Sequence, residues 1–92
     1  MGITMELNDL YIGDGIIECY NFKNDTLTVI FKDFQNSVYN LQFYGCTSIE
    51  ENGSVGFSLC KAQANENQWV VQDDDGQVLA VTFSSVKISK EC

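Results

Sequence analysis

The 92-residue chain contains no histidine, no arginine and no proline. Histidine is the side chain that most often transfers protons near neutral pH, so its absence excludes Ser-His-Asp and Cys-His mechanisms. Proline often protects the edge of a sheet because it lacks a backbone N–H. Without proline, an exposed edge has to rely on charge, twist or a partner chain, which leaves a homodimer through such an edge open.

Basic residues are also scarce. Five lysines stand against 13 acidic residues, and the formal net charge is −8. The lysines are scattered along the chain, at Lys23, Lys32, Lys61, Lys87 and Lys90. A nucleic-acid-binding protein normally carries a clustered basic stripe, so we expect no nucleic acid as a partner. The negative field instead favours solubility and speeds encounter with a protein that has a basic surface.

Long hydrophobic runs are absent. No stretch approaches the roughly 20 apolar residues of a transmembrane helix, and residues 1–6 lack the charged and apolar regions of a secretory signal. Glu6 also stands where a myristoylation signal has Ser or Thr. We therefore expect a cytoplasmic protein that does not enter a membrane.

The four cysteines are Cys19, Cys46, Cys60 and Cys92, which lie 27, 14 and 32 positions apart. This spacing fits no compact zinc motif, and we expect neither a metal ion nor a cofactor. Because nothing indicates an oxidising compartment, the first three are interpreted as reduced, strand-borne and mostly buried, and Cys92 as an exposed terminal thiol. A disulfide framework remains an alternative, with three ways to pair the cysteines.

The dominant periodicity of the sequence is two, which is typical of strands with one buried face. Alternate positions are apolar or aromatic in residues 27–31 and again in residues 39–43. The polar turn between them, residues 33–37, predicts an antiparallel hairpin. Asn-Gly and Asp-Gly pairs mark further turns. The expected strands cover residues 16–23, 26–32, 38–44, 46–49, 55–61, 68–72 and 77–89.

These strands predict a single all-β domain over residues 1–92, because a chain of this length supports one hydrophobic core. We expect an antiparallel meander that forms a curved sheet, a sandwich or a partly open barrel. Residues 4–10 fit either a short helix capped by Thr4 or a strand that leads into Tyr11. In the last strand the apolar positions change parity after Phe83, so we expect a bulge or bend at Ser84-Ser85.

The most distinctive candidate binding site lies around an acidic turn. The apolar run that begins at Trp69 is closely followed by Asp73, Asp74 and Asp75. Tryptophan is a frequent interface anchor, and nearby carboxylates would meet a basic surface. We therefore predict that these four residues contact a partner. The alternative is a core tryptophan with a solvated turn beyond it.

Glu50 and Glu51 form a second acidic pair, which we add to the predicted partner-binding surface. Paired carboxylates can serve as general acid and base, but both acidic clusters lie beside turn glycines, where water keeps the groups ionised. The register of a calcium-binding EF-hand from Asp73 also fails, since Val78 and Ser84 stand where Gly and Glu are required. We predict no catalytic residue and no metal site.

Several segments of the predicted hairpins form a wider pattern. They are Asp14-Gly15-Ile16-Ile17-Glu18, Leu27-Thr28-Val29-Ile30-Phe31, Leu41-Gln42-Phe43-Tyr44-Gly45-Cys46, Asp75-Gly76-Gln77-Val78-Leu79-Ala80-Val81 and Val86-Lys87-Ile88. The pattern resembles small β-rich bacterial proteins grouped with toxin-immunity and uncharacterised families. Such proteins often carry His-Asp ahead of the first strand, where this chain has Gly13-Asp14. The resemblance implies binding, because immunity proteins mask the active site of a toxin, and it transfers no functional residue.

Three function classes remain open. The first is a non-catalytic protein-binding domain, immunity-like or otherwise inhibitory, whose acidic surface docks on a basic partner. The second is a structural or accessory subunit that associates with itself through sheet edges or an aromatic patch. The third is an enzyme that uses carboxylates alone, which requires two close acids in a deep pocket. The sequence favours the first class.

Overall fold

The structure is a computed structural model that describes residues 7–53, 55–56 and 58–90. Within these residues the chain forms eight strands and one short 3-10 helix, η1 (Leu7–Asp9). The strands are β1 (Ile16–Lys23), β2 (Thr26–Lys32), β3 (Val38–Tyr44), β4 (Ser48–Glu51), β5 (Lys61–Ala64), β6 (Gln68–Asp73), β7 (Gly76–Thr82) and β8 (Ser85–Lys90). The predicted all-β class is confirmed.

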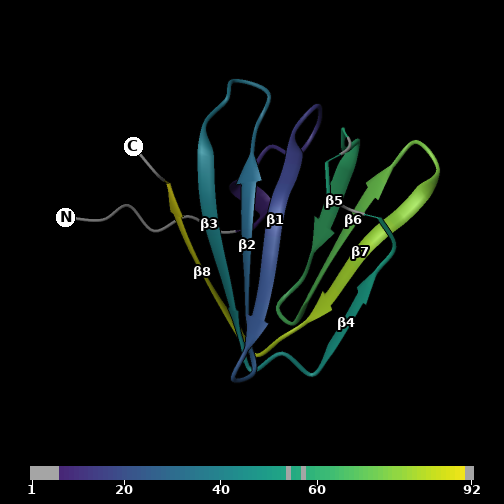
Figure 1. The fold of residues 1–92 in the computed structure, drawn as a ribbon. Helices are drawn as coiled ribbons and strands as arrows, with labels where there is room; N and C mark the ends of the chain where they lie inside the picture. Colours follow the sequence, from purple (N-terminus) through teal and green to yellow (C-terminus); the bar gives the residue numbers. More distant parts are fainter. Residues whose placement is uncertain (1–6, 54, 57, 91–92) are drawn as a thin grey trace.

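The strands form two antiparallel sheets that do not close into a barrel (Figure 1). Sheet A has the order β1-β2-β3-β8, and sheet B has the order β4-β7-β6-β5. Within each sheet three consecutive strands form a meander, as expected. The remaining strand of each sheet arrives from the other one: β4 follows β3 but pairs with β7, and β8 follows β7 but pairs with β3. Of the predicted architectures, the structure is a sandwich.

The hairpin of β2 and β3 supplies much of sheet A's buried face. Its paired inward positions are Leu27 with Phe43, Val29 with Leu41, and Phe31 with Tyr39. The turn between the strands is closed by Asp33, whose Oδ1 accepts hydrogen bonds from the backbone N–H groups of Gln35 and Ser37, each at 2.9 Å. The predicted hairpin is confirmed, and its alternating residues share one face.

The core lies between the sheets and joins them through aromatic rings. Phe43 of sheet A stacks on Trp69 of sheet B, with ring centroids 5.4 Å apart, and also contacts Phe83 at 5.0 Å. Both sheets contribute to one continuous cluster of buried apolar side chains. Trp69 Nε1 is buried without a hydrogen-bond partner among the described residues, a cost of about 1–3 kcal/mol that ring packing must offset.

The predicted last strand is broken where its apolar parity changes. Residues 76–82 belong to sheet B as β7, and residues 85–90 belong to sheet A as β8. At the corner, Phe83 N–H donates to the Asn67 carbonyl and Ser84 N–H to the Tyr44 carbonyl, each at 2.8 Å. The predicted bend at Ser84-Ser85 is thus present, and it transfers the chain from one sheet to the other.

Two predicted strands differ from the structure. The strand expected over 55–61 is wrong: Val55 forms only an isolated bridge with Ile17, and β5 begins at Lys61. The reason is Gly56, whose φ of 88° lies outside the extended region that strand pairing needs. The strand expected over 46–49 is displaced, because β4 spans Ser48–Glu51.

Of the segment expected as a helix or a strand, the structure describes residues 7–10. There η1 forms a single turn, and Leu7 and the following Leu10 are buried in the core. The proposed cap, Thr4, lies outside the described residues. Within the described part of the chain, no helix has the length and apolar character needed to cross a membrane.

Candidate functional site

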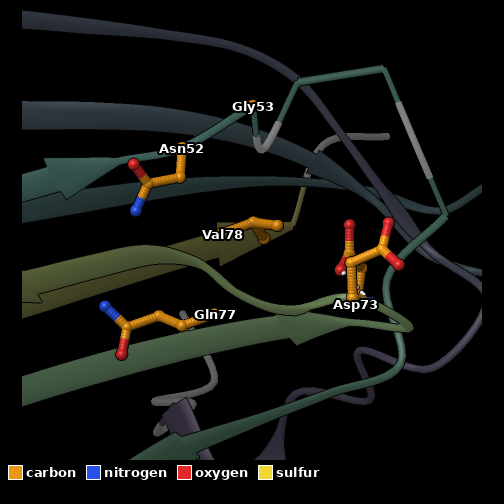
Figure 2. Close-up of a pocket in the computed structure, with 6 residues that line it drawn as sticks. Asn52, Gly53, Asp73, Gln77 and Val78 are labelled. Carbon is orange, nitrogen blue, oxygen red and sulfur yellow. Dashed lines mark hydrogen bonds between the residues drawn. The ribbon is translucent and has the colours of Figure 1, made fainter.

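A pocket of about 440 Å³ lies on sheet B, where the chain after β4 meets the β6–β7 hairpin (Figure 2). Its lining residues are Asn52, Gly53, Asp73, Asp75, Gln77 and Val78. Figure 2 shows the Asp73 side chain on one side of Val78 and the amide side chains of Asn52 and Gln77 on the other. Two carboxylates and two amides, from segments far apart in the sequence, therefore surround one hollow.

The pocket is shaped by an irregularity in the β6–β7 pairing. The register shifts between Val71 and Gln72, so that Gln72 faces Gln77 and Val78 is left as the extra residue of β7. The Val78 carbonyl accepts a hydrogen bond of 2.8 Å from Asn52 N–H, which ties the end of β4 to β7. Sequence reasoning placed a turn at Asn52-Gly53 but missed Gln77 and Val78, because no residue pattern shows that this turn packs against the β6–β7 hairpin.

The turn itself fixes the aspartates. Asp73 pairs with Gly76 across the hairpin, and the φ of 121° at Gly76 is one that side-chain-bearing residues rarely adopt. Asp73 Oδ1 accepts a hydrogen bond of 2.8 Å from Asp75 N–H. This hydrogen bond holds the Asp73 carboxylate against the turn, and both Asp73 and Asp75 line the pocket.

The structure separates the predicted pair Glu50 and Glu51, because neighbouring residues of a strand point to opposite faces. Glu50 reaches the rim of the pocket, where Gln77 Nε2 donates to its Oε2 at 3.4 Å. Glu51 lies on the core side of β4 and accepts a hydrogen bond of 3.4 Å from Tyr20 Oη of sheet A. The charge of Glu51, more than burial, raises the pKa of Tyr20.

Asp74 does not line the pocket. It is exposed and accepts a hydrogen bond of 2.9 Å from Cys60 Sγ, just before β5. This hydrogen bond is the main cause that raises the pKa of the Cys60 thiol, followed by burial and by the charge of Asp74. The predicted acidic triplet therefore divides into two aspartates at the pocket and one that contacts a thiol.

The expected state of the cysteines is partly corrected. Cys19, Cys46 and Cys60 are free thiols, as interpreted, rather than a disulfide framework. Only Cys46 is buried, however, and it lies in the loop after β3, whereas Cys60 precedes β5. Cys19 is exposed because, after the bulge in β1, it pairs with Ile30 on the outward face of sheet A. Cys92 lies outside the described residues.

Trp69 is not a surface anchor. Its side chain is 0% exposed and stacks on Phe43, because it shares the inward parity of Val71 on β6. The prediction that it contacts a partner is wrong, and the alternative of a core tryptophan with a solvated turn beyond it is correct. The exposed aromatic residues of the described chain are Tyr11, Tyr20, Phe22, Phe34 and Tyr44.

Within the described part of the chain, no ion pair involves the acids at the pocket. Among residues 7–53, 55–56 and 58–90, the one ion pair joins Lys32 to Glu18 at 3.9 Å. The same residues contain no group of three or more His, Cys, Asp or Glu side chains placed to hold a metal ion. The pocket thus offers uncompensated carboxylates and amide oxygens to a positively charged group from outside.

Comparisons of the chain with family models, with curated proteins and with solved structures found no match. Its function therefore has to be inferred from the chemistry of its own surface.

Proposed function

We propose that the chain is a non-catalytic protein-binding domain whose acidic pocket on sheet B receives a basic side chain of a protein partner. The observation that carries this proposal is the pocket itself. Asp73 and Asp75 lie at a hollow that also holds the amides of Asn52 and Gln77, with Glu50 at its rim. None of these three carboxylates takes part in an ion pair within the described residues.

The chemistry of the pocket suits arginine or lysine. A guanidinium group presents planar N–H donors that match a carboxylate and neighbouring amide oxygens, and an ammonium group meets the same oxygens as a point charge. Each exposed contact contributes only ~0.2–1 kcal/mol. The net charge of −8 adds long-range attraction, which acts mainly on the rate of encounter and weakens with salt.

The arrangement of the acids supports binding over catalysis. A carboxylate-only enzyme needs two acids close together with their proton affinities driven apart. Glu50 and Glu51 point to opposite faces of β4, and Asp73 uses a carboxylate oxygen to hold its own turn. With the resemblance to toxin-immunity proteins, the partner class that we propose is a toxin or similar protein with a basic surface to be masked.

The test is calorimetric binding of a hexa-arginine peptide to two charge-matched double variants. Asp73→Asn/Asp75→Asn removes two charges at the pocket but keeps an acceptor oxygen for the turn. Asp25→Asn/Glu66→Gln removes two exposed charges outside it and leaves the same net charge. We expect the first variant to lose about tenfold in affinity and the second about twofold or less.

Salt provides the second arm of this test. Affinity should fall steeply between about 50 and about 500 mM salt, because exposed charges are screened within a few ångströms at the higher value. Equal losses in the two double variants would show that net charge acts without the pocket. Binding that ignores salt would remove the electrostatic basis of the proposal.

A further inference from the structure

The two sheets leave four edge strands, β1, β8, β4 and β5, which differ in their protection. Natural edges are kept from pairing with other chains when they are short, charged or bulged. β4 and β5 have four residues each, and β8 carries Lys87 and Lys90. β1 has eight residues, its bulge lies near its beginning, between Ile17 and Cys19, and its charged residues Glu18 and Lys23 leave residues 19–22 uncharged. Residues 18–23 therefore form the least protected edge.

This edge also exposes apolar side chains on its core-facing side. Tyr20 pairs with Val29 of β2, and Phe22 pairs with Leu27, so each points to the same side of the sheet as its partner. Val29 and Leu27 are 0% exposed, whereas Tyr20 is 41% and Phe22 is 49% exposed. The apolar face of sheet A thus continues onto β1 and remains half uncovered there.

The outer side of β1 is occupied only at its beginning. Ile17 forms a parallel bridge with Val55, and its carbonyl accepts a hydrogen bond of 3.0 Å from Gly56 N–H. Beyond this point the described residues place no strand against β1. Its backbone groups there can accept an added strand.

The sequence of this segment is complementary to itself. Tyr20 and Phe22 flank Asn21, with Glu18 and Lys23 toward the two ends. In an antiparallel pair with a two-fold axis at Asn21, the aromatic residues oppose each other across the pair, Tyr20 against the partner's Phe22. Lys23 then opposes the partner's Cys19, beside the partner's Glu18. We propose that the chain forms a homodimer by this pairing of β1, which extends sheet A across two copies.

Size and charge set the expected strength of this dimer. Residues 18–23 are far fewer than the roughly 20–30 residues that each partner contributes to an interface of standard size. The net charge of −8 on each copy opposes association, but charges farther apart than about 8 Å are largely screened at physiological salt. We therefore expect a dissociation constant in the micromolar range or weaker, and association that strengthens as salt is raised.

Sedimentation velocity over about 5–500 μM tests the dimer. The wild-type chain should shift from monomer to dimer with concentration. Phe22→Lys should weaken dimerisation by about tenfold or more, because it removes an opposed aromatic ring and adds a charge at the centre of the pair. Ser89→Lys, the same change of charge on an exposed position of β8, should dimerise like the wild type. Far-ultraviolet circular dichroism confirms that both variants are folded.

A disulfide tests the register. In a background with Cys19→Ser, Cys60→Ser and Cys92→Ser, Asn21→Cys places two thiols opposite each other at the proposed axis, so oxidation should link the copies. Ser89→Cys in the same background should remain monomeric. A wild-type chain that is monomeric throughout, a Phe22→Lys variant that dimerises unchanged, or preferential linkage through Ser89→Cys would overturn the proposal. None of these results bears on the pocket of sheet B.

Discussion

Gly15 shows how the absence of one side chain brings the start of β1 against the β2–β3 hairpin. A Cβ atom built on Gly15 would lie 2.6 Å from Phe31 Cε1 and 2.9 Å from the Lys32 carbonyl oxygen. Phe31 is buried in the core and Lys32 O is backbone, so neither can move away at low cost. Only glycine fits at this position.

We therefore predict that Gly15→Ala lowers the free energy of unfolding by about 2–3 kcal/mol. Gly53→Ala is the matched control: Gly53 has φ of 81° but no atom within 4 Å of its Cβ position, so its cost is backbone strain of about 1 kcal/mol. Urea unfolding of both variants measures the difference. If Gly15→Ala cost no more than Gly53→Ala, the close approach would be wrong.

The Cys60–Asp74 contact makes a prediction about thiol reactivity. The thiolate is the reactive form, and Asp74 raises the pKa of Cys60, chiefly through the hydrogen bond. In a chain with Cys19→Ser and Cys92→Ser, Asp74→Asn should lower that pKa and speed modification by a disulfide reagent at pH 8 by roughly threefold to tenfold. Glu66→Gln should leave the rate unchanged. A rate that stays constant or falls in Asp74→Asn would contradict the contact.

Among the elements, the β2–β3 turn depends on a single carboxylate. Asp33 Oδ1 accepts two backbone hydrogen bonds, from Gln35 and Ser37, and Asn36 has a φ of 65° that the turn must sustain. Asp33→Ala should destabilise the chain by about 1–2 kcal/mol, because both donors lose their partner. Asp33→Asn keeps an acceptor oxygen and should cost less than half as much. Thermal unfolding followed by circular dichroism distinguishes the two, and equal losses would rule out this role of the oxygen.

An element can be predicted from the sequence when neighbouring residues define it, and not when it depends on which distant strands pair. The strands predicted over residues 16–23, 26–32 and 38–44 have these bounds in the structure. Turn residues mark their ends, and residue alternation also identifies the second and third. In the strand expected over 77–89, the change of parity indicated the break at Ser84 but not that the chain moves to the other sheet. Residue alternation shows which face of a sheet a side chain is on, and it does not show which strands pair. The prediction of a strand over 55–61 was wrong because it relied on the apolar residues of this segment and did not account for the conformation that Gly56 adopts.

Some residues of the candidate site could likewise be predicted from the sequence, and others could not. Asp73 and Asp75 were found because an Asp-Gly turn is readable from sequence. For Trp69 the sequence leaves a partner contact and a core position as alternatives, and its parity, shared with the core-facing Val71, agrees with the second. Gln77 and Val78 were missed because no residue pattern shows that the turn after β4 packs against the β6–β7 hairpin. The exposed Tyr20 and Phe22 have core-facing parity, and only the order of the strands shows that β1 is an edge.

At the scale of the whole molecule, the two sheets share one core but present different surfaces. Sheet B carries the pocket, whose carboxylates form no ion pair with the residues described, and sheet A carries the edge of β1, against which those residues place no strand beyond Ile17. The negative charge of the chain favours a basic partner at the first and limits self-association at the second. The two surfaces approach each other where Tyr20 of β1 donates a hydrogen bond to Glu51, the residue before the pocket-lining Asn52.

The most direct measurement of the central claim is a titration of the ¹⁵N-labelled chain with hexa-arginine peptide, followed by ¹H–¹⁵N correlation spectra. The pocket predicts that the largest shifts fall on Asn52, Gly53 and residues 73–77, and that they diminish in Asp73→Asn/Asp75→Asn. Shifts of equal size over the whole acidic surface, or confined to sheet A, would contradict a basic-partner site on sheet B.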